Sequence, residues 1–158
     1  MAEQGAGSSH FSHAGLSRPA PADPCPCGRP AAAGKGKVRP FAECCGRFVG
    51  PMADDSLGAP DAEALMRSRY TAFVLGDADY LLATWHPATR PATLALDPAQ
   101  HWLGLQVKAH LPLDATHAEV AFVARSRDAT GRASRLVEHS RFVREAGRWY
   151  YVDGRLDG

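Results

Sequence analysis

Four cysteines are the residues of this sequence best suited to chemistry. They form two tight pairs, Cys25 and Cys27 in "CPCG" and Cys44 and Cys45 in "ECCG", and the chain has no other cysteine. A thiolate is a soft ligand, and four thiolates in a tetrahedron hold a zinc ion about 2.3 Å from each sulfur. A glycine follows each pair and allows the backbone to turn beneath a metal. The pattern therefore predicts one zinc site with these four cysteines as ligands.

Disulfide bonds and a redox pair are the competing interpretations. Four cysteines allow three disulfide pairings, but a bridge between Cys44 and Cys45 would be strained, because neighbouring Cα atoms are too close for relaxed disulfide geometry. A thioredoxin-like site needs Cys-x-x-Cys at a helix start, and that spacing is absent. Four thiolates fill the coordination sphere of zinc, which predicts a structural metal rather than a catalytic one. A redox-sensing or metal-handling role of the thiols stays open.

The bulk composition restricts the class of protein. The chain has 158 residues, of which 45% are hydrophobic, and a formal net charge of +1. This length fits one domain with appended segments. The balanced charge does not indicate a nucleic-acid partner. No apolar run is long enough to span a bilayer, and the N-terminus lacks the pattern of a secretory signal. We therefore expect a cytoplasmic protein without a membrane partner, in a compartment where free thiols persist.

The amino-acid composition along the sequence divides the chain into four parts. Residues 1–24 are rich in Gly, Ser, Ala and Pro, which predicts disorder. The cysteine segment follows as residues 25–51, then a linker as residues 52–60, and then a folded domain as residues 61–158.

The folded domain reads as helices followed by strands. Helical spacing predicts a helix from Asp61 to Gly76, a shorter one from Asp77 to Pro87, and a third that Asp97 would cap. Alternation then predicts strands over residues 105–113, 117–127, 132–145 and 148–154. In the first of these, one face would carry Leu105, Val107, Ala109 and Leu111. This order predicts an α+β fold in which helices pack on one face of a curved antiparallel sheet.

Several sequence blocks resemble a known family. They are "CPCG" and "FAECCG", then "ALMRSRYTAFVLGDADYLLATWHP", "HWLGLQV", "SRFVRE" and "RWYYVDG". These blocks resemble the YchJ-like family of bacterial proteins, which joins an N-terminal SEC-C zinc-binding motif to a domain of the nuclear transport factor 2-like (NTF2-like) fold. The resemblance implies a cone-shaped α+β domain and carries the zinc ligands onto the four cysteines.

The chain departs from the family in the segment between the two cysteine pairs. Residues 28–43 separate the pairs, and the family has a shorter segment there. Doubling a loop costs only about 0.6 kcal/mol in closure entropy, so we expect the site to survive. The inserted loop is where we expect the inherited geometry to fail first.

A cone of this kind can enclose a pocket, for which polar strand and helix residues are candidates. The candidate pocket residues are Arg69, His86, His110, Glu138, Ser140 and Tyr150. The alternation in "RLVEHSRF" puts Glu138 and Ser140 on one face and His139 and Arg141 on the other, and either face can be the inner one. Glu138 paired with an arginine on a solvated face is the commoner pattern, and buried aromatic residues are more often core than ligand cage.

These observations support two functions of different class. The first is a zinc-binding adaptor, whose knuckle would recognise a protein partner by resemblance to the SEC-C motif. The second is a small-molecule enzyme of the dehydratase, isomerase or hydrolase type, with Glu138 or a histidine as general base. A cavity of roughly a few hundred Å³ in which Glu138 faces a second polar group would favour the second function.

Overall fold

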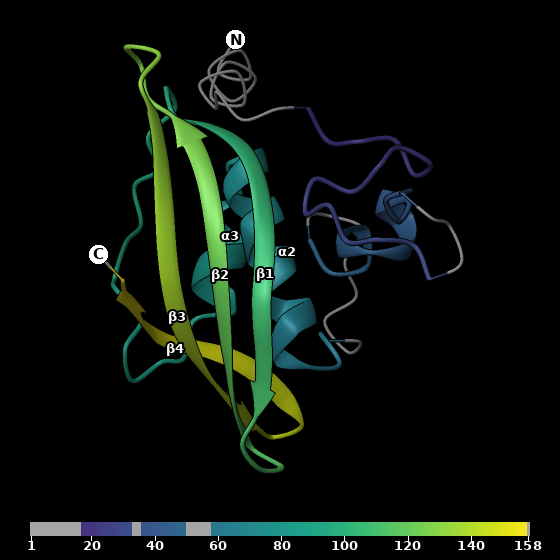
Figure 1. The fold of residues 1–158 in the computed structure, drawn as a ribbon. Helices are drawn as coiled ribbons and strands as arrows, with labels where there is room; N and C mark the ends of the chain where they lie inside the picture. Colours follow the sequence, from purple (N-terminus) through teal and green to yellow (C-terminus); the bar gives the residue numbers. More distant parts are fainter. Residues whose placement is uncertain (1–16, 33–35, 50–57, 158) are drawn as a thin grey trace, which may run out of the picture.

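The protein is an α+β domain with a cysteine-bearing N-terminal module. The computed structural model describes residues 17–32, 36–49 and 58–157. In these residues, helices α2 (Ala62–Leu75) and α3 (Ala78–Ala83) precede four strands. Figure 1 shows both helices on one face of the curved sheet, with the N-terminal module beside α2 and away from the sheet. This arrangement confirms the predicted fold class. None of the described helices has the length and apolarity needed to cross a membrane.

The sheet is an antiparallel meander with the strand order β1-β2-β3-β4. The strands are β1 (His101–Pro112), β2 (His117–Arg127), β3 (Ala133–Glu145) and β4 (Arg148–Leu156). The central pair β2 and β3 runs in unbroken register, whereas the β1–β2 and β3–β4 pairs contain bulges. The inner face of the sheet, which packs on the helices, carries buried side chains such as Val120, Phe122 and Phe142.

A bulge in β1 changes which side chains face the helices. The predicted common face of this strand holds only as far as Val107, where the register shifts and Lys108 is left without a partner. Beyond the bulge His110 pairs with the buried Val120, while Leu111 is 41% exposed. One extra residue reverses the alternation of every residue that follows it. The prediction that Ala109 and Leu111 continue the inner face is therefore wrong.

The first two predicted helices are present with their caps, although α3 ends at Ala83 and not at Pro87 as predicted. The Asp61 carboxylate accepts a hydrogen bond from the backbone N–H of Ala64 at 2.8 Å, and Gly76 ends α2 in the left-handed conformation with φ 73°. Asp77 caps α3 in the same way by accepting from the N–H of Tyr80 at 3.0 Å. Side-chain caps and glycine ends are local features, which is why the sequence alone predicts them.

The predicted third helix is wrong. Asp97 does cap a turn, because its carboxylate accepts from the N–H of Ala99 at 2.9 Å and its carbonyl accepts from the N–H of Gln100 at 3.1 Å. The chain then enters β1 at His101. The side chain of Trp102 packs on the core from this strand, so the sheet takes the residues that would have continued the helix.

Helix α2 is buried on all sides. It contacts β1, β2 and β4 on one side and the module on the other. Its polar residues Arg67, Ser68, Arg69 and Thr71 are buried together with its apolar ones. A helix buried all round loses the polar stripe of a surface helix, which explains why its sequence is only weakly amphipathic.

We call residues 17–49 the cysteine module, of which residues 33–35 lie outside the described part. It contains two short 3₁₀ turns, η1 (Phe41–Glu43) and η2 (Cys45–Arg47). The hydrogen bonds that hold its N-terminal end include one from the N–H of Phe41 to the Asp23 carbonyl at 2.7 Å and one from Arg18 to the Val49 carbonyl at 2.8 Å. Residues 17–24 therefore belong to this module rather than to the predicted disordered segment. Residues 1–16 and most of the predicted linker lie outside the described residues.

Candidate metal centre and cavity

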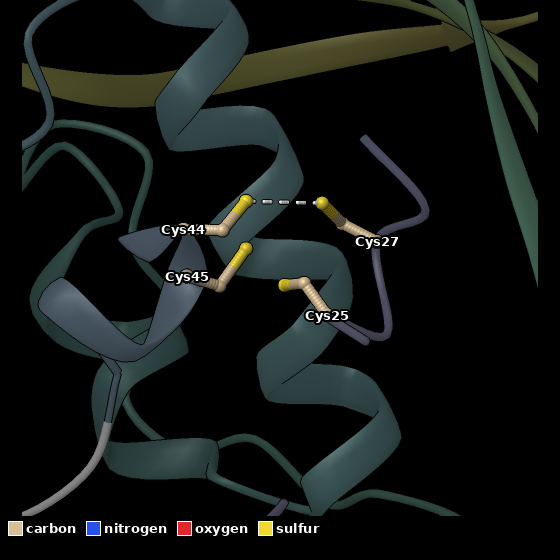
Figure 2. Close-up of side chains that lie close together, drawn as sticks. All are labelled: Cys25, Cys27, Cys44 and Cys45. Carbon is tan, nitrogen blue, oxygen red and sulfur yellow. Dashed lines mark hydrogen bonds between the residues drawn. The ribbon is translucent and has the colours of Figure 1, made fainter. Parts of the chain in front are cut away.

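The four cysteine side chains converge on one point. Their sulfur atoms all lie within 4.8 Å of one another, and none of the four residues is more than 4% exposed. Figure 2 shows the two pairs approaching from opposite sides, with α2 behind them. Zinc at about 2.3 Å from each thiolate would place tetrahedral sulfurs about 3.8 Å apart. The Cys27 and Cys44 sulfurs lie 3.6 Å apart, so the cluster has the size and the donor set of a metal site.

Two local structures hold the cysteine pairs. The first pair lies on a ladder, in which the N–H of Cys25 donates to the Arg39 carbonyl at 2.9 Å, and it ends in a turn where Gly28 has φ 74°. The second pair lies at the junction of the two turns, since Cys44 separates η1 from η2 and Cys45 begins η2. The position after that pair requires a glycine, because a Cβ on Gly46 would lie 2.6 Å from the Phe41 carbonyl oxygen.

The long segment between the pairs continues the ladder away from the metal. The N–H of Arg39 donates to the Arg29 carbonyl at 2.8 Å, and the N–H of Ala31 donates to the Lys37 carbonyl at 2.9 Å. Pro30 and Val38 form a bridge between these two bonds. The described residues of the insertion thus extend a hairpin, and the cysteines at its base stay together. The expected failure of geometry is not seen in this part, and residues 33–35 at the tip lie outside it.

The four thiols share their protons unequally. Hydrogen bonds from Cys27 and then from Cys44 and Cys45 lower the pKa of the Cys25 thiol. Contact with Cys25 raises the pKa of Cys44, but hydrogen bonds with Cys27 and Cys45 lower it further, to about 7. Hydrogen bonds with Cys25 and Cys44 raise the pKa of Cys27, and hydrogen bonds with the other three cysteines raise the pKa of Cys45. The cluster therefore carries part of the negative charge of four thiolates, and a bound metal ion would displace the remaining protons.

Arg67 brings a positive charge to the cluster from α2. Its guanidinium donates to the Cys27 carbonyl at 3.3 Å and approaches the Cys27 sulfur at 3.9 Å. Its Nε donates to Glu63 at 2.9 Å, and the other oxygen of Glu63 lies 3.9 Å from His110 on β1. Burial alone would lower the pKa of Arg67, but Glu63 and the charge on Cys27 raise it. Cys25 also meets α2, since its sulfur lies 4.0 Å from the Thr71 hydroxyl.

On the opposite side of α2 the helices and the sheet enclose a cavity of about 330 Å³. Half of the side chains that line it are aromatic, and the lining residues come from α2, the segment after α3 and all four strands. The lining residues include Arg69, Trp85, Trp102, Ala124, Glu138 and Tyr151.

Glu138 faces this cavity, which settles which face of β3 is inner. Its carboxylate accepts a hydrogen bond from the Ser140 hydroxyl at 2.5 Å. It also interacts with the Tyr151 hydroxyl, and burial followed by this negative charge raises the pKa of Tyr151 to about 12. The carboxylate lies directly over Gly154 of β4, where a Cβ would come within 2.6 Å of its carboxyl carbon. The commoner pattern, in which Glu138 pairs with a surface arginine, is therefore not the one the protein adopts.

Arg69 supplies the positive charge of the cavity. It is only 6% exposed, and its Nη1 donates to the Leu81 carbonyl at 2.7 Å and to the Thr84 hydroxyl at 2.6 Å. Its guanidinium also lies over the rings of Tyr151 and Trp85, at 4.4 Å and 5.3 Å from the ring centroids. Burial lowers the pKa of Arg69 to about 10, so it stays charged at neutral pH.

Known proteins resemble this chain over most of its length. A family model described as the middle NTF2-like domain of YchJ matches residues 61–154. A UPF0225 protein from Polaromonas naphthalenivorans is 61% identical over 135 residues, which cover 83% of this chain and 96% of the relative. The chain belongs to the YchJ family. A UPF0225 protein from Bordetella pertussis is 57% identical, over 84% of this chain and 92% of its own.

Two solved structures extend the YchJ-family likeness to the cysteine module. The solution structure of a SEC-C motif containing protein from Rhodopseudomonas palustris has a TM-score of 0.67 and 28% identity, and the match covers 86% of this chain and all of that one. The crystal structure of a SEC-C motif containing protein from Psychrobacter arcticus has a TM-score of 0.65 and 30% identity, and the match covers 87% and 85%. The chain is thus a YchJ-like protein that combines a SEC-C motif with an NTF2-like domain.

The pocket candidates from the sequence separate into two groups in this YchJ-family structure. Arg69, Glu138 and Ser140 all line the cavity. His86 instead binds Glu145 at 2.9 Å in an open groove at the end of the sheet. His110 lies near Glu63, and Tyr150 faces a smaller pocket that Phe48 and Arg148 also line. The last three residues are therefore distant from the chemistry that Glu138 offers.

Sequence reasoning did not place the aromatic and apolar lining in the cavity, and the missed residues include Trp85, Gln100, Trp102 and Tyr151. The run Trp149-Tyr150-Tyr151 has large aromatic residues on both faces of β4, so alternation does not distinguish Tyr150 from Tyr151. The neighbouring glycine was the available clue. Gly154 opposes Ser140 across the β3–β4 ladder, and a glycine inside a strand often marks a place where another group approaches closely.

Proposed function

We propose that this protein binds one zinc ion through Cys25, Cys27, Cys44 and Cys45, and that the metal is structural. The observation that supports this proposal is the convergence of four buried sulfurs within 4.8 Å. Four soft thiolate donors in a small tetrahedral space favour zinc, with an iron site as the chemical competitor. We place the protein in the cytoplasm, where such thiols stay reduced.

The role of the metal follows from where the cysteine module lies. The module contributes Phe41, Phe48 and Val49 to the same core as Leu65 of α2. A metal that fixes the module therefore also covers α2. In its described residues, the cysteine module packs against α2 and forms part of the core of the folded domain.

Elemental analysis of protein purified without chelator tests the metal. We expect about one zinc per chain, and Cys45→Ser should lower this content. Ser126→Ala is the matched control, because it removes another buried hydrogen-bonding side chain, at the far end of β2. Protein that contains no metal, or iron in place of zinc, contradicts the proposal.

We further propose that the outer surface of the module binds a protein partner, which would make the protein an adaptor. Polar residues such as Asp23, Lys37 and Glu43 are exposed on it. Deleting the module would uncover α2, so exchanging exposed charges is the cleaner test. The double variant Lys37→Glu, Glu43→Lys keeps the net charge, and it should abolish capture of a partner that Lys108→Glu on β1 still captures. Equal capture by both variants contradicts the adaptor role.

The cavity supports a second candidate function, which is the binding of a small molecule. The observation that favours it is a space of about 330 Å³ that contains the Glu138 carboxylate and the Arg69 guanidinium. An enzyme of the dehydratase, isomerase or hydrolase type would use Glu138 as its general base, because it is the only carboxylate among the lining residues and no histidine lines the cavity.

Occupancy of the cavity is measurable through its tryptophans. Naphthalene should change the fluorescence of Trp85 and Trp102 in the metal-loaded protein, since both line the cavity. Ala124→Leu adds bulk to the same wall and should abolish the change. A fluorescence change that survives Ala124→Leu, or no change in the wild type, contradicts this second function.

A further inference from the structure

The walls of the cavity are suited to a flat aromatic ligand. Aromatic side chains contact one another around it, edge to face for Tyr70 and Trp102 at 5.8 Å between ring centroids and for Trp85 and Tyr151 at 5.1 Å, and tilted for Phe73 and Trp102 at 5.7 Å. Edge contacts of this kind hold the rings in fixed orientations. A planar molecule can then enter against the ring faces without rearranging the wall.

The size of the cavity limits the ligand. An engineered cavity of about 150 Å³ in another protein takes up benzene. The present cavity has about twice that volume, 330 Å³. It lies at the lower end of the roughly 300–1,000 Å³ typical of small-molecule sites. A bicyclic aromatic molecule fits this space, whereas a nucleotide does not.

Glu138 offers a hydrogen-bond acceptor in a fixed position. Its Oε2 atom receives the Ser140 hydroxyl at 2.5 Å, and its carboxylate also interacts with the Tyr151 hydroxyl. A carboxylate has about four acceptor sites, so these two contacts leave capacity for a ligand donor. The missing side chain of Gly154 creates the space in which the carboxylate lies.

The charge of the cavity favours a neutral ligand. Arg69 and Glu138 carry opposite charges and act on each other electrostatically, and among the described residues no other charged side chain lines the cavity. A ligand with a net charge would leave one buried charge uncompensated, which is costly in an apolar space.

We infer that this cavity binds a neutral bicyclic aromatic molecule that has a hydrogen-bond donor for Glu138 on its edge. This inference rests on the small-molecule function proposed above and specifies its ligand. Lactams of fused aromatic rings and naphthols are the simplest members of the class. They combine a planar body with a polar edge.

Calorimetric titration of the metal-loaded protein with 2-quinolinone and 2-naphthol tests the class. We expect at least one of the two to bind about tenfold more tightly than naphthalene, which has the same rings without the polar edge. Methylation of its donor, as in N-methylquinolinone or 2-methoxynaphthalene, should remove this advantage. If naphthalene binds as tightly as both polar probes, the cavity is a purely apolar site and the inference fails while the small-molecule function stands. If no probe binds, both fail.

A pair of glycine variants shows whether Glu138 carries the selectivity. Gly154→Ala would displace the Glu138 carboxylate, and we expect the preferred polar probe to lose about tenfold in affinity while naphthalene binding stays the same. Gly104→Ala on β1 is the control, since a Cβ there meets no atom within 4 Å. Thermal unfolding confirms that both variants are folded. Unchanged affinity of the polar probe in a folded Gly154→Ala variant overturns the role of Glu138.

Discussion

Arg67 and Arg69 are two residues apart on α2, but they lie in different surroundings. Arg67 faces the cysteine module, and Arg69 faces the cavity between α2 and the sheet. Two residues turn an α-helix by about 200°, so the two side chains leave the helix in opposite directions. Arg67 reaches the cysteine cluster, where it hydrogen-bonds to the Cys27 carbonyl and to Glu63. Arg69 reaches the cavity, where it lies over the rings of Tyr151 and Trp85. Both are buried, at 8% and 6% exposure.

The difference lies in what balances each charge. Arg67 lies beside four buried thiols, which would carry the full negative charge of four thiolates only with the metal ion that we propose. Arg69 and Glu138 balance each other without any added group, so the cavity is neutral before a ligand enters. One buried helix thus separates a site that needs a cation from a site that excludes charge. Changes on either side should then have separate effects on metal content and on ligand binding.

The largest effect should come from the metal side. Cys45→Ser removes one ligand and leaves the remaining buried thiolates without a full coordination sphere. Breaking a buried charged cluster costs about 3–5 kcal/mol. Because the module covers α2, we expect the free energy of unfolding of the whole domain to fall, measured by urea denaturation with circular dichroism.

A chelator separates the metal from the side chain in that experiment. Wild-type protein stripped of metal should be as unstable as Cys45→Ser, and chelator should then have little further effect on the variant. If the stripped protein unfolds at the same urea concentration as the loaded one, the metal does not hold the module on α2. The comparison between the two faces would then lose its basis.

Arg69→Met should be the next largest change, and it acts on the cavity side. The substitution removes two hydrogen bonds and leaves Glu138 as an uncompensated buried charge, which costs about 3 kcal/mol or more. Zinc content should stay at the wild-type level, because Arg69 points away from the cysteines. Urea denaturation gives the free energy of unfolding, and elemental analysis of the same sample gives the zinc content. A loss of zinc in a folded Arg69→Met variant would contradict the separation of the two sites.

Arg67→Met is the corresponding substitution on the metal side of α2. It should lower the free energy of unfolding less than Arg69→Met does. Glu63 keeps a neighbour in His110, and the metal retains its four thiolates. Groups that hydrogen-bond to metal ligands typically contribute about 10–100-fold to metal affinity, and we expect a loss in that range in a competition assay with a chromophoric chelator. Probe binding in the cavity should not change. Wild-type zinc affinity in the variant would show that Arg67 only fills space.

Local features of the chain were predictable from the sequence, and features that depend on distant contacts were not. The two cysteine pairs, the Asp61 cap and Gly76 each act within a few residues of themselves, and the order of helices and strands gave the α+β class. The bulge after Val107 is different. It depends on how β1 fits the twist of β2, and it alone decides that His110 rather than Leu111 faces α2.

The inner face of β3 shows the same limit. Leu136 and Phe142 lie on one face, and Val137 and Val143 on the other, so the apolar pattern is equal on both sides. Only the packing of α2 and the absence of a side chain at Gly154 select the face that carries Glu138. The burial of α2 on its second side had a weak local clue in its small residues Ala64, Ser68 and Thr71, which allow the cysteine module to approach closely.

Tyrosine ionisation gives the smallest test, because it compares one phenol from each side of the molecule. Burial, above all, raises the pKa of Tyr80, which hydrogen-bonds to Ser68, to about 12, and it raises the pKa of Tyr151 in the cavity to about 12 as well. An unfolded chain loses these protons near pH 10. Between about pH 10 and pH 12 the folded state therefore holds more protons than the unfolded state, and stability falls as the pH rises.

Tyr80→Phe and Tyr151→Phe should each make the free energy of unfolding less dependent on pH in this range, by the contribution of one proton. Urea unfolding at intervals between pH 9 and pH 12 measures this dependence. The stabilisation from each phenol is complete below pH 10 and is lost as the pH approaches 12. A bound neutral ligand that covers Tyr151 should move only the step that Tyr151→Phe removes, and leave the Tyr80 step in place. If the ligand moves both steps equally, α2 transmits the state of the cavity to its other side, and the two sites are coupled rather than separate.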